Sequence, residues 1–158
     1  MKGAILEKQE MFYTYMDVLF ESMSNMETDY NWLITDYECN RYIEPITCER
    51  RGNFVWVTGE KLSEYLRENK IQFIWGVFSA FEKSVDIEEI MQYDLPKSNK
   101  RFFKSGIMKI QNPLSLMEIV AMDSSLVFLI SSKEEYINEF MACFPMAKDL
   151  EMYLEQLC

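Results

Sequence analysis

Apolar residues recur at helical spacing near the start of the chain. Phe12, Met16, Leu19 and Met23 stand at positions i, i+4, i+7 and i+11, a spacing that places them on one face of a helix. The pattern predicts a first helix over roughly residues 4–23. The breadth of its apolar face predicts that it packs across a sheet.

Runs of β-branched and aromatic residues predict strands further along the chain. The most apolar runs contain Trp56 and Trp75, so both tryptophans are expected to be largely buried. Alternate side chains from Ile71 to Val77 are expected to share one face of their strand. The predicted strands are 32–37, 54–57 and 71–78, followed by a hairpin with arms 117–122 and 126–130 around a turn at 123–125.

Capping signals predict the remaining helices. Residues 97–113 are expected to be irregular, apart from a short strand at 106–110. The helix signals are Thr58 before a helix over 59–68, Asp86 with Glu89 before a short helix, Ser132 with Glu135 before a helix that Pro145 ends, and an apolar spacing over 147–157.

The order of these elements predicts the fold class. Helices and strands do not alternate strictly, so a doubly wound parallel sheet is not expected. Residues 1–158 contain no linker-like or repeated segment and are of a length that fits one domain. We therefore expect a single α+β domain with a mainly antiparallel or mixed sheet of about five strands and helices mostly on one face.

Composition removes several classes of chemistry. The chain has no histidine and a net charge of −10. Serine or cysteine nucleophiles that need a histidine base are excluded, as are the common histidine-containing metal sites. The five glycines lie far apart, so no phosphate-binding loop is predicted. We expect no cofactor, no metal site and no catalytic residue of a familiar kind.

The cysteines bear on the compartment. They form no CxxC pair, and an apolar leader or membrane-spanning run is not evident. We expect free thiols in a cytoplasmic protein. The four positions are Cys39, Cys48, Cys143 and Cys158.

Acidic residues concentrate in the first third of the chain. Residues 1–50 hold ten Asp and Glu against four Lys and Arg, which suggests an acidic binding face for a protein with a basic surface. An alternative use is carboxylate chemistry by Asp36, Glu38 and Asp123 in a small-molecule site or a weak hydrolase. The candidates for the acidic face are Asp29, Asp36, Glu38, Glu44 and Glu49.

Basic residues concentrate between Lys97 and Lys109, where five of the sixteen Lys and Arg lie and no acid does. Adjacent phenylalanines suggest either a solvated loop anchored in the core or a surface for an acidic partner, including an acidic face of this same chain. Nucleic acid is a less favoured partner because the body of the protein repels phosphates. The candidate residues are Lys100, Arg101, Phe102, Phe103 and Lys104.

Two stretches, Asn31–Asp36 and Phe54–Leu62, resemble small uncharacterised bacterial proteins classed as a domain of unknown function. The hairpin turn at 123–125 and the segment Phe144–Leu150 fit the same family. The resemblance implies a cytoplasmic α+β domain and assigns no catalytic residue. In size, charge and fold class the chain is also similar to small acidic immunity proteins of bacterial toxin systems.

These observations favour a non-enzymatic interaction module over an enzyme. The expected partner is a protein, in the most concrete version one whose basic surface an acidic inhibitor would mask. A membrane is not an expected partner, and the sequence does not determine the oligomeric state.

Overall fold

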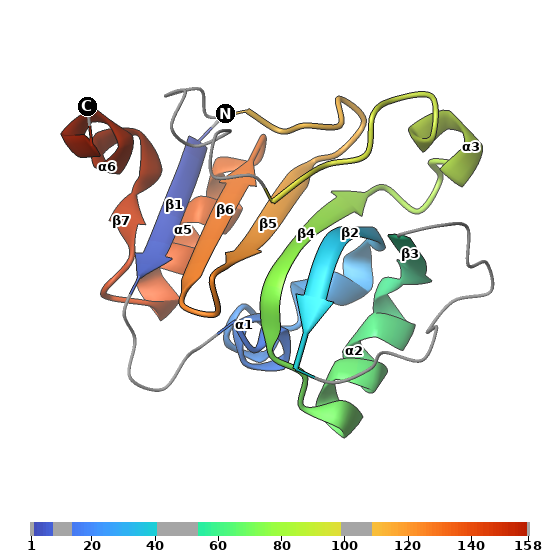
Figure 1. Ribbon diagram of the computed structural model, residues 1–158, viewed down its shortest axis with the longest axis horizontal. Coiled ribbons are helices and arrows are strands. Elements are labelled where there is room, and N and C mark those ends of the chain that lie inside the picture. The colour runs from blue at the N-terminus through green and yellow to red at the C-terminus, as the bar shows by residue number, and fades with distance from the viewer. Residues whose placement is uncertain (1, 8–13, 41–53, 99–108, 158) are drawn as a thin grey trace.

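A single antiparallel sheet organises the described part of the chain, residues 2–7, 14–40, 54–98 and 109–157 of a computed structural model (Figure 1). Its strand order is β3-β2-β4-β5-β6-β1-β7, so it has seven strands rather than about five. The strands are β1 (Lys2–Glu7), β2 (Asn31–Cys39), β3 (Phe54–Thr58), β4 (Phe73–Phe81), β5 (Met117–Met122), β6 (Leu126–Ser131) and β7 (Lys148–Asp149).

Helices cover both faces of this sheet. The elements are α1 (Met16–Ser22), the short 3₁₀ helix η1 (Met26–Asp29), α2 (Gly59–Asn69), α3 (Ile87–Ile90), α5 (Glu134–Cys143) and α6 (Leu150–Leu157). Side chains of α1, α2 and α5 pack on one face, here called the helical face, and those of α3 and α6 pack on the opposite face. Every residue of β5 is buried, and successive side chains of a strand point to opposite faces, so the sheet is covered on both faces.

The first strand corrects the prediction of a helix over 4–23. Residues Lys2–Glu7 form β1, which pairs with β6 from Lys2↔Ser131 to Glu7↔Leu126, and the helix begins only at Met16. Ala4 and Leu6 pack on the helical face, whereas Ile5 packs on the opposite face. A short continuous apolar run fits a buried strand as well as a helix, so the sequence pattern alone could not separate them.

The burial of the tryptophans also differs from the prediction that Trp56 and Trp75 are largely buried. Trp56 and Trp75 are half-buried, whereas Trp32 is fully buried under α1, with its ring 5.3 Å from that of Phe20. Trp56 lies on the edge strand β3, where fewer neighbours cover it.

The residues from Ile71 to Val77 do not share one face. Trp75 and Val77 pack on the opposite face, whereas Ile71 and Phe73 pack on the helical face. The pairing of β2 with β4 shifts register between Thr35 and Cys39, beside this point of β4. Such an irregularity breaks the strict alternation of side chains on which the prediction relied.

Two of the three predicted caps are confirmed. The Thr58 hydroxyl accepts a hydrogen bond from the main-chain N–H of Lys61, and the Asp86 carboxylate accepts one from that of Glu88. The Ser132 capping box is wrong, because the Ser132 hydroxyl donates to the carbonyl of Leu116 and no side chain caps α5.

The remaining boundaries differ in detail. The predicted last helix, 147–157, divides into β7 and α6, because residues Lys148 and Asp149 pair with β1. The predicted strand at 106–110 lies largely outside the described residues, and 109–110 are not in a strand.

The main chains of α2 and η1 approach each other closely on the helical face. A Cβ atom at Gly59, the first residue of α2, would overlap the main-chain carbonyl of Glu27. The main-chain N–H of Gly59 donates to the carbonyl of Tyr30 over 2.9 Å. This contact fixes the main chain of Tyr30, immediately before β2, against the start of α2.

Candidate functional site

The predicted acidic face does not form one surface among the described residues. Asp29 is exposed at the end of η1, whereas Asp36 and Glu38 are exposed near the other end of β2. The five steps from Asn31 to Asp36 alone span about 17 Å at the rise of a strand. Two other members, Glu44 and Glu49, lie outside the described residues.

Asp36 is engaged within the chain. It adopts the left-handed conformation with φ of 46° at the register shift of β2. Its carboxylate accepts hydrogen bonds from the main-chain N–H of Ser98 at 2.7 Å and from the Ser98 hydroxyl at 2.8 Å. Asp36 therefore holds the segment that leads into the predicted basic stretch, which gives this carboxylate a structural use.

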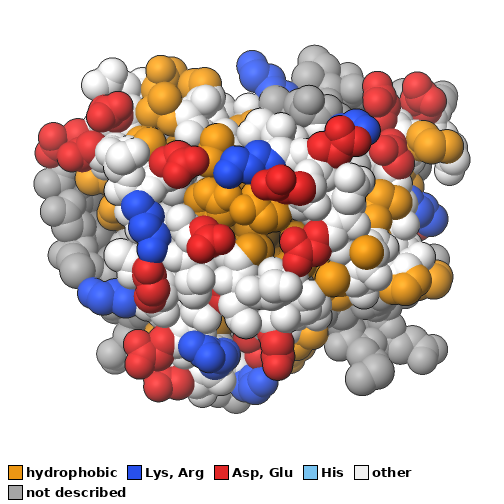
Figure 2. Space-filling model, turned by 180° about the vertical axis from the view of Figure 1, so that it is seen from behind, with side chains coloured by type: hydrophobic (Ala, Val, Ile, Leu, Met, Phe, Trp, Pro, Cys, Tyr) orange, Lys and Arg blue, Asp and Glu red, His pale blue; other side chains and the backbone are white. Residues whose placement is uncertain are grey.

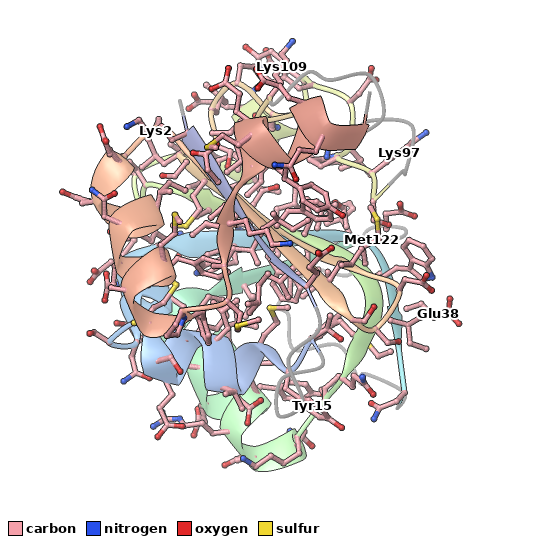
Figure 3. All side chains as sticks on the ribbon, turned by 90° about the vertical axis from the view of Figure 1, so that its left-hand side faces the viewer. Lys2, Tyr15, Glu38, Lys97, Lys109 and Met122 are labelled. Carbon is pink, nitrogen blue, oxygen red and sulfur yellow. The ribbon has the colours of Figure 1, made fainter. Side chains whose placement is uncertain are left out.

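Two residues of the alternative carboxylate site, Glu38 and Asp123, do not lie on neighbouring strands. Glu38 and Met122 both pair with Trp75, from opposite sides of β4, so β2 and β5 lie about 10 Å apart there. Figure 3 shows Glu38 and Met122 on the same side of the molecule. Asp123 follows Met122 in the hairpin turn with φ of 55°.

The two described ends of the basic stretch are joined. The Gln111 side chain accepts from the main-chain N–H of Lys97 at 2.9 Å and donates to the Lys97 carbonyl at 3.1 Å. Figure 3 labels Lys97 and Lys109, which flank this connection. The remaining candidates Lys100, Arg101, Phe102, Phe103 and Lys104 lie outside the described residues.

A buried glutamate underlies this connection. Glu118 is fully buried on β5, and its Oε1 accepts from the main-chain N–H groups of Gln111 at 2.9 Å and Asn112 at 3.1 Å and from the Ser79 hydroxyl at 3.5 Å. Its Oε2 is buried and has no hydrogen-bond partner in the described structure.

The surroundings of Glu118 change its acidity. Burial raises the pKa of its carboxyl group to about 7, and the two main-chain donors oppose that rise. A group this inaccessible does not touch a substrate, so its role is to join residues 111–112 to the sheet. The signal in the sequence was a single acid within the apolar run 117–122, which the prediction did not use.

The helical face carries a second cluster, formed by two tyrosines and a lysine. Tyr30 lies just before β2, Lys133 just before α5, and Tyr136 in the first turn of α5. The two tyrosine hydroxyls are 2.6 Å apart, and the Lys133 ammonium donates to the Tyr30 hydroxyl at 3.1 Å. The same ammonium lies 5.5 Å from the centre of the Tyr30 ring and 5.9 Å from that of Tyr136.

The tyrosines remain neutral at physiological pH. Burial raises the pKa of both hydroxyls, and the hydrogen bond to Tyr30 adds to the rise at Tyr136. Tyr30 is only 3% exposed, whereas Tyr136 and Lys133 are half-buried. Tyr136 and Lys133 therefore form the solvent-accessible part of the cluster.

Three carboxylates lie near this cluster. Asp29, Glu82 and Glu135 are exposed, and their charges act on the Tyr30 hydroxyl. Within the described residues none of the three forms an ion pair. Figure 2 shows hydrophobic side chains gathered near the centre of the helical face, with acidic side chains around them. We call the following set the acidic tyrosine patch: Asp29, Tyr30, Glu82, Lys133, Glu135 and Tyr136.

Of the predicted acidic candidates that the structure describes, Asp29 belongs to this patch and Asp36 and Glu38 do not. Sequence reasoning missed the tyrosine pair, because Tyr30 and Tyr136 are 106 residues apart and no motif links them.

Metal binding and membrane crossing are two properties for which the described residues were compared with known requirements. Those residues contain no group of three or more Cys, Asp or Glu arranged to hold a metal ion. Across the same ranges, no helix combines the length and the apolar character needed to cross a bilayer.

Comparison of the chain with protein-family models, with curated proteins and with solved structures found no match.

Proposed function

We propose that this protein is a non-enzymatic interaction module that binds a partner protein through the acidic tyrosine patch. The observation that carries the proposal is a hydrogen-bonded tyrosine pair with three exposed carboxylates nearby, which form no ion pair within the described residues. Tyrosine contributes large contact area at low entropic cost and is enriched among residues that dominate binding energy.

The partner that fits this patch has a basic surface. The patch holds three carboxylates and one ammonium group, and the whole chain carries a net charge of −10. Opposite charge on the partner would accelerate encounter and fix orientation. An immunity-like inhibitor in the cytoplasm, which masks a basic active surface, is the most concrete form of this proposal.

The alternative, a small-molecule site or hydrolase at Asp36, Glu38 and Asp123, has less support. The Asp36 carboxylate already accepts two hydrogen bonds from Ser98, so it is poorly placed to act as a free acid or base. No observation in the described residues favours this function over binding.

The test uses two triple variants that change net charge equally. The patch variant carries Asp29→Asn, Glu82→Gln and Glu135→Gln. The control variant neutralises three exposed acids of the opposite face, at Glu88, Glu89 and Glu151. Both lose three negative charges, so non-specific attraction to basic proteins falls equally in both.

Wild type and both variants serve as baits in the native cell, and association rates are then measured with the purified partner. A partner that wild type and the control capture, and the patch variant does not, supports the proposal. Its association rate should fall with salt for wild type and be slower for the patch variant. A partner bound equally by both variants, or no partner specific to wild type, contradicts the proposal.

A further inference from the structure

We propose that Tyr30 and Tyr136 form a cation-binding site in which Lys133 is a resident occupant, and that an arginine side chain of the partner protein displaces it. The inference rests on the proposed function for the choice of a basic partner, and it identifies the group that the patch recognises. Lys133 would then act as an internal competitor that sets the affinity of the patch.

The geometry shows that the tyrosine pair accepts a cation. The Lys133 ammonium is close to both ring centres and donates to the Tyr30 hydroxyl at 3.1 Å. Attraction between an ammonium group and the negative face of an aromatic ring accounts for this position. Tyr30 is nearly completely buried and packs edge-on against Tyr136, so a cation from a partner would reach the pair where Tyr136 and Lys133 are half-buried at the surface.

The resident cation is held only by neutral groups. Lys133 forms no ion pair within the described residues, although Glu135 lies in the same turn and Asp29 and Glu82 also act on Tyr30. Lys133 is half-buried at the surface, so water can replace its hydrogen bond to Tyr30 when the side chain leaves. Such an occupant is readily exchanged.

Arginine fits the vacated position better than lysine. A guanidinium group can stack flat on the ring of the half-buried Tyr136 and still direct N–H pairs at a carboxylate, whereas an ammonium group is a compact point charge. The carboxylates come from three different segments: Asp29 ends η1, Glu82 follows β4 and Glu135 lies in α5.

The experiment measures binding of three short peptides that differ only at one position: arginine, lysine or the neutral isostere citrulline. Titrations at physiological salt use wild type, Lys133→Met and Lys109→Met. Methionine keeps an unbranched chain over Tyr30 and removes the charge. Lys109 is exposed and precedes Ile110, which packs on the opposite face of the sheet, so Lys109→Met is a control for the change in net charge.

We expect the arginine peptide to bind Lys133→Met about five-fold more tightly than wild type, because the peptide no longer has to displace a resident cation. Lys109→Met should bind as wild type does, and the citrulline peptide should not distinguish the three proteins. Tyr136→Leu should abolish the preference for arginine over lysine. Weaker or unchanged binding to Lys133→Met, or a preference that survives Tyr136→Leu, would overturn the exchange.

A direct readout keeps the test valid if a variant does not fold. In wild type, the ¹³Cε resonance of Lys133 should move toward its position in a free lysine when the arginine peptide binds, because the side chain leaves the shielding region of the rings. An unmoved resonance at saturation refutes displacement.

The two proposals fail in different ways. If the peptide binds wild type and not the patch variant, yet Lys133 stays in place, the exchange is wrong and the binding surface stands. If the peptide and the captured partner bind the patch variant as well as they bind wild type, the surface itself is wrong.

Discussion

The pH dependence of stability should reveal the buried carboxyl group of Glu118. Within the described residues this group has no charged hydrogen-bond partner, and burial raises its folded-state pKa from 4.5 to about 7. Between these two values the folded protein binds a proton that the unfolded chain has released. The free energy of unfolding should therefore fall as the pH rises from about 4.5 to about 7, and this contribution should level off above that range.

The magnitude follows from the size of the shift. Each unit of pKa corresponds to about 1.4 kcal/mol, so the ionised form should lower stability by about 3 kcal/mol relative to the protonated form. This is a large part of the ~5–15 kcal/mol typical of a domain.

Glu118→Gln isolates this contribution. The amide keeps the shape and an acceptor for the N–H groups of Gln111 and Asn112, but it does not titrate. Urea denaturation of wild type and variant at pH 4.5, 6 and 8 gives the difference in unfolding free energy at each pH. Contributions of all other titrating groups cancel in that difference, and Glu88→Gln on the surface is the matched control.

We expect the difference to shift by about 3 kcal/mol in favour of Glu118→Gln between pH 4.5 and pH 8. A difference that does not change with pH would refute the reasoning. It would show that the main-chain donors compensate the burial and keep the carboxylate ionised throughout.

Three other outcomes can be measured on single variants or on wild type. Trp32→Ala should lower the unfolding free energy by about 3–5 kcal/mol, from lost burial and the cavity left behind, whereas Trp56→Ala should cost clearly less; equal costs in denaturant titrations would contradict the burial of Trp32. Gly59→Ala should be severely destabilising because its methyl group overlaps a main-chain carbonyl, whereas Gly76→Ala, with its nearest neighbours at 3.4 Å, should shift the unfolding midpoint little by comparison. Thiol titration should find four free cysteines after denaturation. In the native protein the exposed Cys143 should react rapidly, whereas Cys39 should react slowly because burial raises the pKa of the Cys39 thiol to about 12. Fewer than four thiols, or a rapid reaction of Cys39, would refute this.

Local patterns determined a substantial part of the fold. The hairpin of β5 and β6 was predicted at almost its observed bounds, because two apolar runs flank a short polar turn. The helix α2 was predicted with its Thr58 cap, since the cap and the apolar spacing lie within a few residues of each other. In each case the interactions that select the structure connect neighbours in the sequence.

Distant contacts decided the elements that the sequence misassigned. Residues 2–7 became a strand because β6, more than 110 residues later, supplies its ladder partners. The hydroxyl of Ser132 bonds the carbonyl of Leu116 instead of capping the next helix. A local propensity of about 1 kcal/mol yields readily to such tertiary contacts.

The candidate surface depended almost wholly on the tertiary structure. The absence of histidine and the net charge already argued for binding over familiar catalysis, and Asp29 was among the predicted acids. The pairing of Tyr30 with Tyr136, the position of Lys133 over both rings and the internal use of Asp36 were not predictable. A sequence specifies which side chains carry charge or rings, but only the tertiary contact of Tyr30, just before β2, with Tyr136 of α5 determines which of them meet, because that contact joins residues more than a hundred positions apart.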